Sequence, residues 1–383
     1  MVGQLKVIDL FAGAGGLSLG FKNSGFKVIS AVEIDKNLSQ TYIKNFPGTK
    51  IFEEDIENID SKLLLDNHKN VDVIVGGPPC QGFSMSGKRI RSNGIFLNDK
   101  RNKLFKEFVR VIKDLKPNVF VMENVPGILN IFQGRTKNQI LSIFRSIGYN
   151  TNIKVLLAAD YGVPQLRKRA FFIGNKLDIE PEFLFPEKIL NEKEYITVEQ
   201  AIFDLPFIES GKGEFKSIYD KSPFSNYQKL MRKDSKHLYN HISTDHDKKV
   251  LDIIKMLNEG EGRNNLPKNL QTKSIHSGAY MRMVKKKPAY TITTRFDTPP
   301  VGRVTHPVAN RALTAREAAR IQSFPDNFIF YGKKSHIGKQ IGNAVPPLLA
   351  NEIAKNLKFR LNLSDKNQIP KNLKNYQYSL KLA

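Results

Sequence analysis

The only cysteine of the chain, Cys80, lies in the run GGPPCQGFS at residues 76–84. Two prolines stiffen the backbone ahead of the thiol, and glycines on both sides leave it open. A lone cysteine is more often a small buried apolar residue than a nucleophile. Here, however, a strand-like run ends just before it, where α/β sheets bind ligands, and a cationic stretch that favours the thiolate follows. One cysteine builds neither a zinc–thiolate site nor a redox pair, so we expect no metal, and the pattern favours nucleophilic catalysis.

Glu123 follows a second strand-like run, at residues 119–122. Because the carboxyl ends of parallel strands gather at one edge of a sheet, this carboxylate can face Cys80. In a partly apolar cleft it can hold a proton near neutral pH and act as an acid, although an ordinary acid at a helix start is the plainer interpretation. Gln165, Arg167 and Arg169 share one face if a strand begins there, which indicates either phosphate or base contacts or a solvated edge.

A glycine-rich turn at Gly13, Gly15 and Gly16 separates a strand-like run from a helical one. Such glycines let the backbone approach a ligand closely. Glu33, at the end of the next strand-like run, is placed to accept hydrogen bonds from ribose hydroxyls. Asp55 could accept a hydrogen bond from the adenine amino group. A tight turn with surface acids would look the same. The pattern favours an adenosine-containing cofactor and leaves both a nicotinamide dinucleotide and S-adenosylmethionine open.

These residues are positioned by an alternation of strands and helices. Strand-like runs cover residues 5–10, 27–32, 71–75, 119–122 and 170–174, and helical patterns cover residues 17–23 and 103–115. Their richness in β-branched residues is typical of a parallel sheet. The order predicts a doubly wound, Rossmann-like α/β domain.

This alternation ends near Pro186, beyond which Gly, Pro, Asn and Lys become more frequent. A helical pattern returns at residues 314–323, where Thr314 and Glu317 form a capping box, and again after Pro347. We therefore expect a catalytic and cofactor-binding domain, a smaller irregular domain, a bridging segment with a returning helix, and a basic tail, at residues 1–187, 188–310, 311–360 and 361–383.

The charge of the chain is strongly basic: 60 Lys and Arg against 37 Asp and Glu give a formal net charge of +23 over 383 residues. Basic residues concentrate in residues 88–103 and 262–310, which favours a polyanionic partner such as nucleic acid over an evenly solvated surface. No run of residues is long and apolar enough for a membrane span. A single cysteine excludes a disulfide-built module. The N-terminus runs straight into a strand with no signal peptide, so we expect a cytoplasmic protein.

Six short motifs together resemble those of the cytosine-5 DNA methyltransferases, in the same order and across nearly the whole chain. The matching segments are Asp9–Phe21, Gly77–Ser84, Glu123–Val125, Gln165–Arg169, Arg311–Pro325 and Gln340–Pro347. The long interval before Arg311 is where this family keeps its variable target-recognition domain. The resemblance implies that this domain occupies residues 188–310.

The resemblance implies a chemical role for each candidate catalytic residue. The Cys80 thiolate adds to carbon 6 of cytosine, which makes carbon 5 nucleophilic toward the methyl group of S-adenosyl-L-methionine. Glu123 holds or protonates ring nitrogen 3, and Arg169 steadies the base carbonyl with Arg167 in support. Because a duplex hides carbon 6 in the stack, the base must be flipped out.

The same resemblance assigns ligand contacts. Those to S-adenosyl-L-methionine are Phe11, Gly13, Gly15, Gly16, Glu33, Ile34, Asp55, Ile56, Leu104 and Asn343. Ile34 stands where the family often has an aromatic stacking partner. The contacts to double-stranded DNA are Ser84, Ser86, Lys88, Arg89, Thr294 and Arg295. We expect a monomer that protects host DNA, with the family's common companion, a cognate restriction endonuclease, as a partner.

Three other interpretations compete with this one. An RNA methyltransferase of the same fold acts on transfer RNA, but those relatives usually carry a Cys-Phe-Thr element, and this chain has no second cysteine. A sequence-specific DNA-binding protein with an idle catalytic domain would need a defect in Cys80, Glu123 or the glycine turn, and all are present. A nicotinamide oxidoreductase would leave Cys80, Glu123 and the arginines without a joint purpose, so it ranks last.

Overall fold

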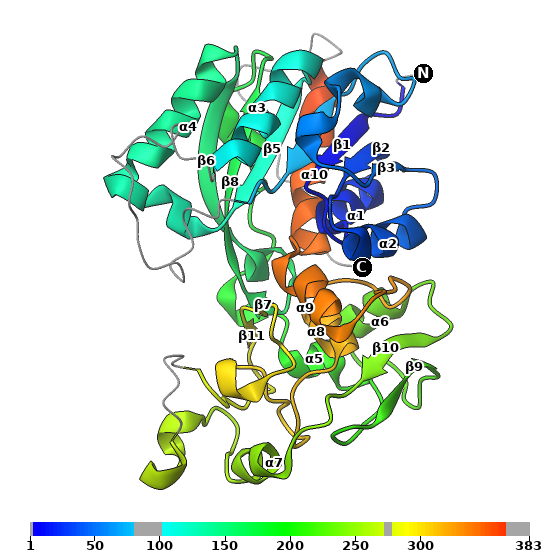
Figure 1. Cartoon of the computed structure of the whole chain (residues 1–383), viewed down its shortest axis with the longest axis vertical. Helices are drawn as coiled ribbons and strands as arrows, with labels where there is room; N and C mark the ends of the chain where they lie inside the picture. Colours follow the sequence, from blue (N-terminus) through cyan, green and yellow to red (C-terminus); the bar gives the residue numbers. More distant parts are fainter. Residues whose placement is uncertain (1–2, 80–101, 272–277, 365–383) are drawn as a thin grey trace.

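The computed structural model describes residues 3–79, 102–271 and 278–364 of the chain (Figure 1). Its main element is a seven-stranded sheet in the order β3-β2-β1-β4-β5-β8-β6. The strands are β1 (Lys6–Leu10), β2 (Lys27–Val32), β3 (Lys50–Phe52), β4 (Val73–Gly76), β5 (Val119–Asn124), β6 (Asn150–Leu157) and β8 (Lys168–Asn175). All neighbours pair in parallel except β8, which is antiparallel to both β5 and β6. The strand order reverses between β1 and β4, which confirms the doubly wound α/β fold.

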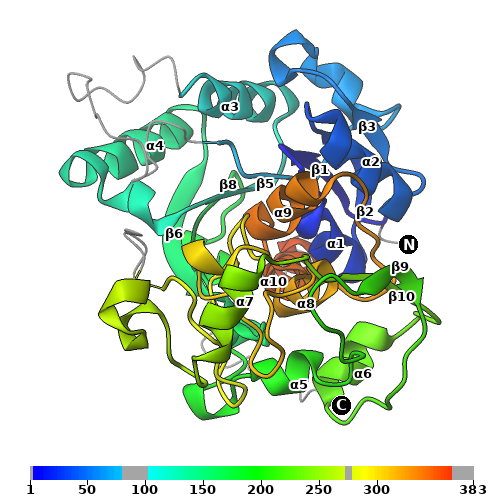
Figure 2. The ribbon, with the colours of Figure 1, turned by 60° about the horizontal axis from the view of Figure 1, so that its bottom comes forward.

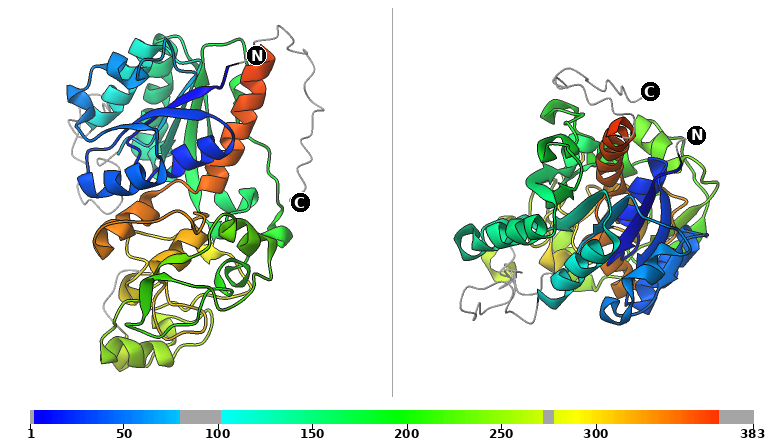
Figure 3. Two further views of the ribbon diagram at one scale, coloured as in Figure 1. Left: turned by 90° about the vertical axis from the view of Figure 1, so that its right-hand side faces the viewer. Right: turned by 90° about the horizontal axis from the view of Figure 1, so that it is seen from above.

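Helices cover both faces of this sheet, which is why its central strands are apolar on both sides. The helices are α1 (Gly16–Asn23), α2 (Lys36–Asn45), α3 (Lys103–Leu115), α4 (Arg135–Ser146) and α10 (Pro347–Ser364). On β1, Val7 faces the core formed with α1 and α10, whereas its neighbour Ile8 faces the core formed with α3 and α4. Figure 3 shows α10 running along the sheet beside the first strands of the chain.

The contact between α1 and α10 is a close backbone approach. A Cβ atom on Gly16 would lie 2.2 Å from the Val345 carbonyl oxygen, and one on Gly20 would lie 2.4 Å from the Ala350 Cβ. Only glycine fits at such distances. The last described helix is therefore held directly against the first one, and the residues before it are brought to the glycine turn of β1 and α1.

A second lobe lies below the sheet in Figure 1 and is built from short elements. Its helices are α5 (Val198–Ile202), α6 (Asn226–Arg232), α7 (Lys248–Lys255), α8 (Ala315–Ile321) and α9 (Lys334–Asn343). β9 (Gly213–Ser217) pairs with β10 (Leu238–Ile242), and β11 (Ala289–Tyr290) pairs in parallel with β7 (Gln165–Leu166). The predicted capping box of Thr314 and Glu317 at the start of α8 is confirmed.

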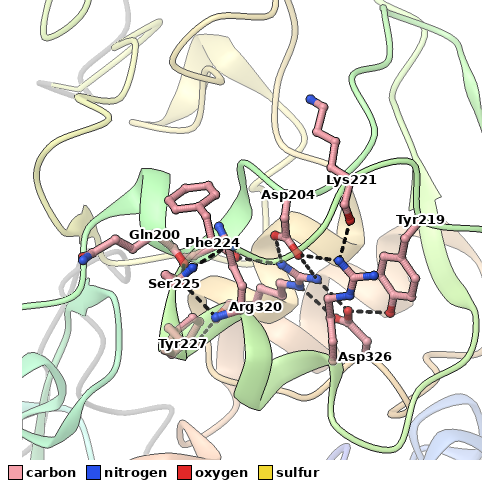
Figure 4. A network of polar contacts seen from close by, with 12 residues as sticks. Gln200, Asp204, Tyr219, Lys221, Phe224, Ser225, Tyr227, Arg320 and Asp326 are labelled. Atoms are coloured by element: carbon pink, nitrogen blue, oxygen red, sulfur yellow. Dashed lines mark hydrogen bonds and ion pairs between the residues drawn. The ribbon is translucent and has the colours of Figure 1, made fainter.

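Arg320 on α8 is the centre of a buried polar network in this lobe (Figure 4). Its fully buried guanidinium donates to both carboxylate oxygens of Asp326, at 2.9 and 2.7 Å, and also pairs with Asp204. Tyr219 donates to Asp326 as well, at 2.7 Å. Arg320 lowers the pKa of the Asp326 carboxyl, although burial alone would raise it. Arg320 thus pairs with two buried carboxylates, one of which also lies 3.7 Å from Arg316, and joins α8 to the segments around it.

We predict that Arg320→Met destabilises the protein by about 3–5 kcal/mol, because it leaves Asp204 and Asp326 without their shared cation. Urea unfolding followed by circular dichroism measures the loss. The control is Arg232→Met, since Arg232 is partly exposed and lies 3.4 Å from Asp204. Equal losses in the two variants would contradict this account of the network.

A second buried network joins β1 to α1 and α2. Asp9 accepts hydrogen bonds from the Ser18 backbone N–H at 3.1 Å and from the Ser18 hydroxyl at 2.6 Å, and the hydroxyls of Ser18 and Tyr42 lie 2.6 Å apart. Burial raises the pKa of Asp9 to about 7, even though both bonds from Ser18 oppose the rise. The carboxyl group therefore keeps its proton under conditions in which it would lose it in the unfolded chain.

This raised pKa has a consequence for stability. Between about pH 4 and pH 7 the native Asp9 holds a proton that the unfolded chain has lost, so its contribution to stability falls as pH rises, by about 1.4 kcal/mol per pH unit. Asp9→Asn lacks this titration. We expect the unfolding free energy of the wild type, minus that of the variant, to decrease from pH 4 to pH 7. Parallel stability curves from pH 4 to pH 7 would show that Asp9 does not titrate as described.

Candidate active site

A cavity of about 530 Å³ opens beside the carboxyl ends of β1, β2, β4 and β5, at the point where the strand order reverses. Figure 2 shows α9 beside these strands, and Lys339, Gln340 and Asn343 of this helix line the cavity. Its size suits a nucleoside-sized ligand. The residues predicted from the sequence that line it are Phe11, Gly13, Gly16, Glu33, Ile34, Asp55, Ile56, Leu104, Glu123, Arg169 and Asn343.

The glycine turn between β1 and α1 shapes the floor of this cavity. Gly13 and Gly15 both have a positive φ, which favours glycine. Gly13 lines the cavity but Gly15 does not. A Cβ atom on Gly15 would lie 2.4 Å from the Phe46 ring. We expected Gly15 to contact a ligand. A glycine is instead required at this position because Tyr42 of α2 and Phe46 at the end of that helix pack against it.

Glu33 is held in place by the turn it faces. One carboxylate oxygen accepts from the Gly13 N–H at 2.8 Å, and the other accepts from the Asp35 N–H at 2.8 Å. Burial raises the pKa of Glu33, and these two bonds oppose the rise. The carboxylate has lone pairs left beyond its backbone bonds, so it can still accept hydrogen bonds from vicinal hydroxyls.

The remaining wall combines apolar side chains with acids. Ile34 is 61% exposed, and with the buried Ile56 it offers an apolar surface to a flat ring. Asp55 caps the short turn after β3 by accepting from the Glu57 N–H at 3.1 Å. Beneath them one oxygen of the buried Asp9, Oδ1, has no hydrogen-bond partner among the described residues. This lining fits S-adenosyl-L-methionine. Its carboxylates can accept hydrogen bonds from the ribose hydroxyls and the adenine amino group, and its apolar side chains can pack against the purine. Its acids also suit the cationic groups of the cofactor.

Glu123, at the end of β5, lines the cavity together with Arg169. Its carboxylate lies 2.8 Å from Nε of Arg169 on β8, which pairs with β5. Burial raises the pKa of Glu123, and the charges of Arg169 and Arg167 oppose the rise. A Cβ atom on Gly77 would lie 3.0 Å from the second Glu123 oxygen, so the absence of a side chain there keeps the carboxylate accessible. This group can exchange a proton with a bound base.

Arg167 and Gln165 require a correction. We expected both to contact a base or phosphate, but both are fully buried and neither lines the cavity. Arg167 donates to the carbonyl oxygens of Ile292 at 3.0 Å and Gly342 at 2.8 Å. Gln165 accepts from the Ile292 N–H at 2.7 Å. Both side chains therefore bond to the second lobe, and of the three predicted residues only Arg169 reaches the Glu123 carboxylate.

Several predicted residues lie outside the described part of the chain: Cys80, Ser84, Ser86, Lys88 and Arg89. The described chain leads to this segment through Pro78 and Pro79, which both line the cavity next to Glu123. Of the remaining predicted DNA contacts, Thr294 is partly buried, and Arg295 is exposed and donates to the Thr298 hydroxyl at 3.3 Å.

Sequence reasoning missed Lys339, an exposed residue of α9 that lines the cavity. Its place next to the Gln340–Pro347 motif was the available signal. Within residues 3–79, 102–271 and 278–364 no three His, Cys, Asp or Glu side chains gather as metal ligands. Across the same ranges no helix has both the length and the apolar character needed to cross a membrane.

Comparison with known proteins places this site in a family. The family model for C-5 cytosine-specific DNA methylases matches residues 5–359. The type II methyltransferase M.DdeI of Desulfomicrobium norvegicum is 40% identical over 378 residues, which cover 93% of this chain and 89% of that relative. M1.HphI of Haemophilus parahaemolyticus, also a type II methyltransferase, is 41% identical over 353 residues, with 92% and 86% covered.

A solved structure agrees with these relatives. The crystal structure of a DNA modification methyltransferase encoded within a prophage, from E. coli, aligns with a TM-score of 0.75 and 32% identity. It covers 94% of this chain and 100% of that one. The matches span the sheet, the cavity and the second lobe together. The family resemblance of the six motifs is thereby confirmed, and the chain belongs to the C-5 cytosine-specific DNA methylases.

Proposed function

We propose that the chain transfers a methyl group to carbon 5 of a flipped-out cytosine in one short double-stranded DNA sequence, through a covalent adduct of Cys80 at carbon 6. The methyl donor of the family, S-adenosyl-L-methionine, supplies an electrophilic methyl carbon when bound. The observation that carries the proposal is the pairing of Glu123 and Arg169 at the wall of an adenosine-fitting cavity, next to the prolines that lead to Cys80.

At the base, Cys80, Glu123 and Arg169 have different chemical roles. The Cys80 thiolate donates an electron pair to carbon 6, and the ring electrons move toward nitrogen 3, where Glu123 holds or delivers a proton. The raised pKa of Glu123 suits this role, because a carboxyl that keeps its proton can donate a hydrogen bond. Arg169 orients that carboxyl and steadies the base carbonyl. Once carbon 5 carries the methyl group, loss of its proton to a base expels the Cys80 sulfur.

The lobes divide recognition from chemistry in this proposal. Residues 1–187 hold the cofactor and the reacting base, residues 188–310 read the DNA sequence, and residues 311–360 bring the chain back to the cavity, followed by a basic tail at residues 361–383. Arg295 supports the recognition role, because it is exposed and an arginine can pair with guanine or hold a phosphate. Ser84, Ser86, Lys88 and Arg89 are proposed phosphate contacts or fillers of the space that the flipped base leaves.

We further propose a monomer that acts in the cytoplasm as the methylating half of a type II restriction–modification system. M.DdeI and M1.HphI, which cover most of this chain, are both named type II methyltransferases. A cognate restriction endonuclease is the partner that such a role requires, and methylation of its recognition sequence would protect the host DNA.

The first test incubates the purified protein with S-adenosyl-L-methionine and unmethylated genomic DNA, followed by bisulfite sequencing, with a transfer RNA pool in parallel. We expect protected cytosines within one short DNA motif. The Cys80→Ala variant should lose methyl transfer and retain DNA binding, because it lacks only the nucleophile. Protection confined to RNA would favour the RNA methyltransferase, and turnover by Cys80→Ala would refute the covalent mechanism.

Glu123→Gln tests the proton role separately. The wild-type rate should fall at high pH, as Glu123 loses its proton above its raised pKa. Glutamine cannot ionise, so the variant should lose the high-pH fall while its rate drops by about 10²–10⁴-fold. Single-turnover rates across pH measure both effects. A variant with the wild-type pH profile would contradict the role assigned to Glu123.

A further inference from the structure

Helix α9 contacts the cofactor cavity on one face and the second lobe on another. Lys339, Gln340 and Asn343 line the cofactor cavity. Gly338 and Gly342, one helical turn apart and therefore on a common face, lie against the backbone of Thr293 and Thr294. A Cβ atom on Gly338 would lie 2.4 Å from the Thr294 carbonyl oxygen, and one on Gly342 would lie 2.4 Å from the Thr294 nitrogen. The helix that closes the cavity thus touches directly the segment that precedes Arg295.

We call residues 289–294 the link segment. Its first two residues form β11, which pairs with β7. Its Ile292 N–H donates to Gln165, and its Ile292 carbonyl accepts from Arg167 at 3.0 Å. From β7 the chain passes through Arg167 into β8 and Arg169, the partner of Glu123. The link segment therefore contacts the catalytic strand on one side and the cofactor helix on the other.

Arg167 forms hydrogen bonds with both the link segment and α9. Its guanidinium donates to the link segment at Ile292 and to α9 at Gly342, where the Gly342 carbonyl accepts at 2.8 Å. The side chain is fully buried, and no carboxylate within the described residues forms an ion pair with it. The hydrogen bonds to these two carbonyls therefore replace the hydrogen bonds to water that the guanidinium loses on burial. If either carbonyl moved away, a buried cation would lose a partner, which is costly. Displacement of α9 and displacement of the link segment are therefore energetically tied.

We propose that Gly338, Gly342 and Arg167 are positioning residues that couple the cofactor cavity to the DNA-contacting segment. A cofactor that orders α9 sets the position of the link segment and of Arg295 beyond it. Target DNA that holds Arg295 in turn sets α9 around the cofactor. The inference rests on the proposed function, because it takes the cavity as the cofactor site and Arg295 as a DNA contact. By linkage, each ligand must tighten the other by the same factor.

The experiment measures that factor with the demethylated product S-adenosylhomocysteine, which forms a stable complex because no methyl transfer follows. The dissociation constant of a duplex carrying the target motif is measured with and without S-adenosylhomocysteine, and that of S-adenosylhomocysteine with and without the duplex. In the wild type we expect both to tighten about 5-fold or more, and equally. In Gly338→Ala the factor should approach 1, while S-adenosylhomocysteine alone binds within about threefold of its wild-type affinity. Gly338 is the glycine to change because it does not line the cavity.

Two further variants make the result unambiguous. Gly127→Ala is the matched control, because a Cβ atom there would meet nothing within 4 Å, and it should keep the wild-type factor. Arg167→Lys keeps the charge but cannot present two donors in the fixed geometry of a guanidinium, so it should lower the factor independently. A wild-type factor of 1, or an unchanged factor in both Gly338→Ala and Arg167→Lys, would overturn the proposal. Wild-type protein that binds neither ligand would instead refute the proposed function itself.

Discussion

The backbone contact between α1 and α10 is the constraint on which the site depends. Gly20 admits α10, and Gly16 admits the residues just before it, so closely that a single added carbon would overlap them. Through this contact the last described helix lies on the first one, and Asn343 enters the wall of a cavity whose floor is the turn after β1. The strands alone would leave the cavity open on that side. Residues more than 300 positions apart in the sequence are therefore parts of one binding site.

The distribution of charge separates two kinds of binding. The chain as a whole carries a net charge of +23, yet five acids line the cavity: Asp9, Glu33, Glu54, Asp55 and Glu123. Arg169 and Lys339 are the basic residues among the described lining. Carboxyl oxygens accept hydrogen bonds, so they suit the hydroxyl, amino and ammonium groups of the cofactor and disfavour phosphate. The basic excess of the rest of the chain suits the DNA backbone outside it.

Local patterns in the sequence predicted what local physics decides. Apolar runs located β1, β2, β5 and α3, and the Thr314–Glu317 spacing located the start of α8. Glu33 and Glu123 were placed correctly at the cavity because parallel strands end on one edge. Apart from α8, the short helices of the second lobe escaped prediction, since their packing against distant segments stabilises them more than their own periodicity does. For the same reason the burial of Arg167 was invisible: its partners, Ile292 and Gly342, lie at least 125 residues away.

The pairing of β11 with β7 bears on how such an enzyme can change its specificity. If the second lobe is exchanged for that of a relative, the new chain must still supply a backbone that pairs with Gln165, accepts from Arg167 and fits against the two glycines of α9. Residues 289–294 meet all three conditions, so their backbone is constrained by β7 and α9 as well as by the rest of the second lobe. A chimera that keeps these contacts therefore has one junction just before Ala289, and a lobe grafted with its own version of these residues must match the recipient's α9 as well.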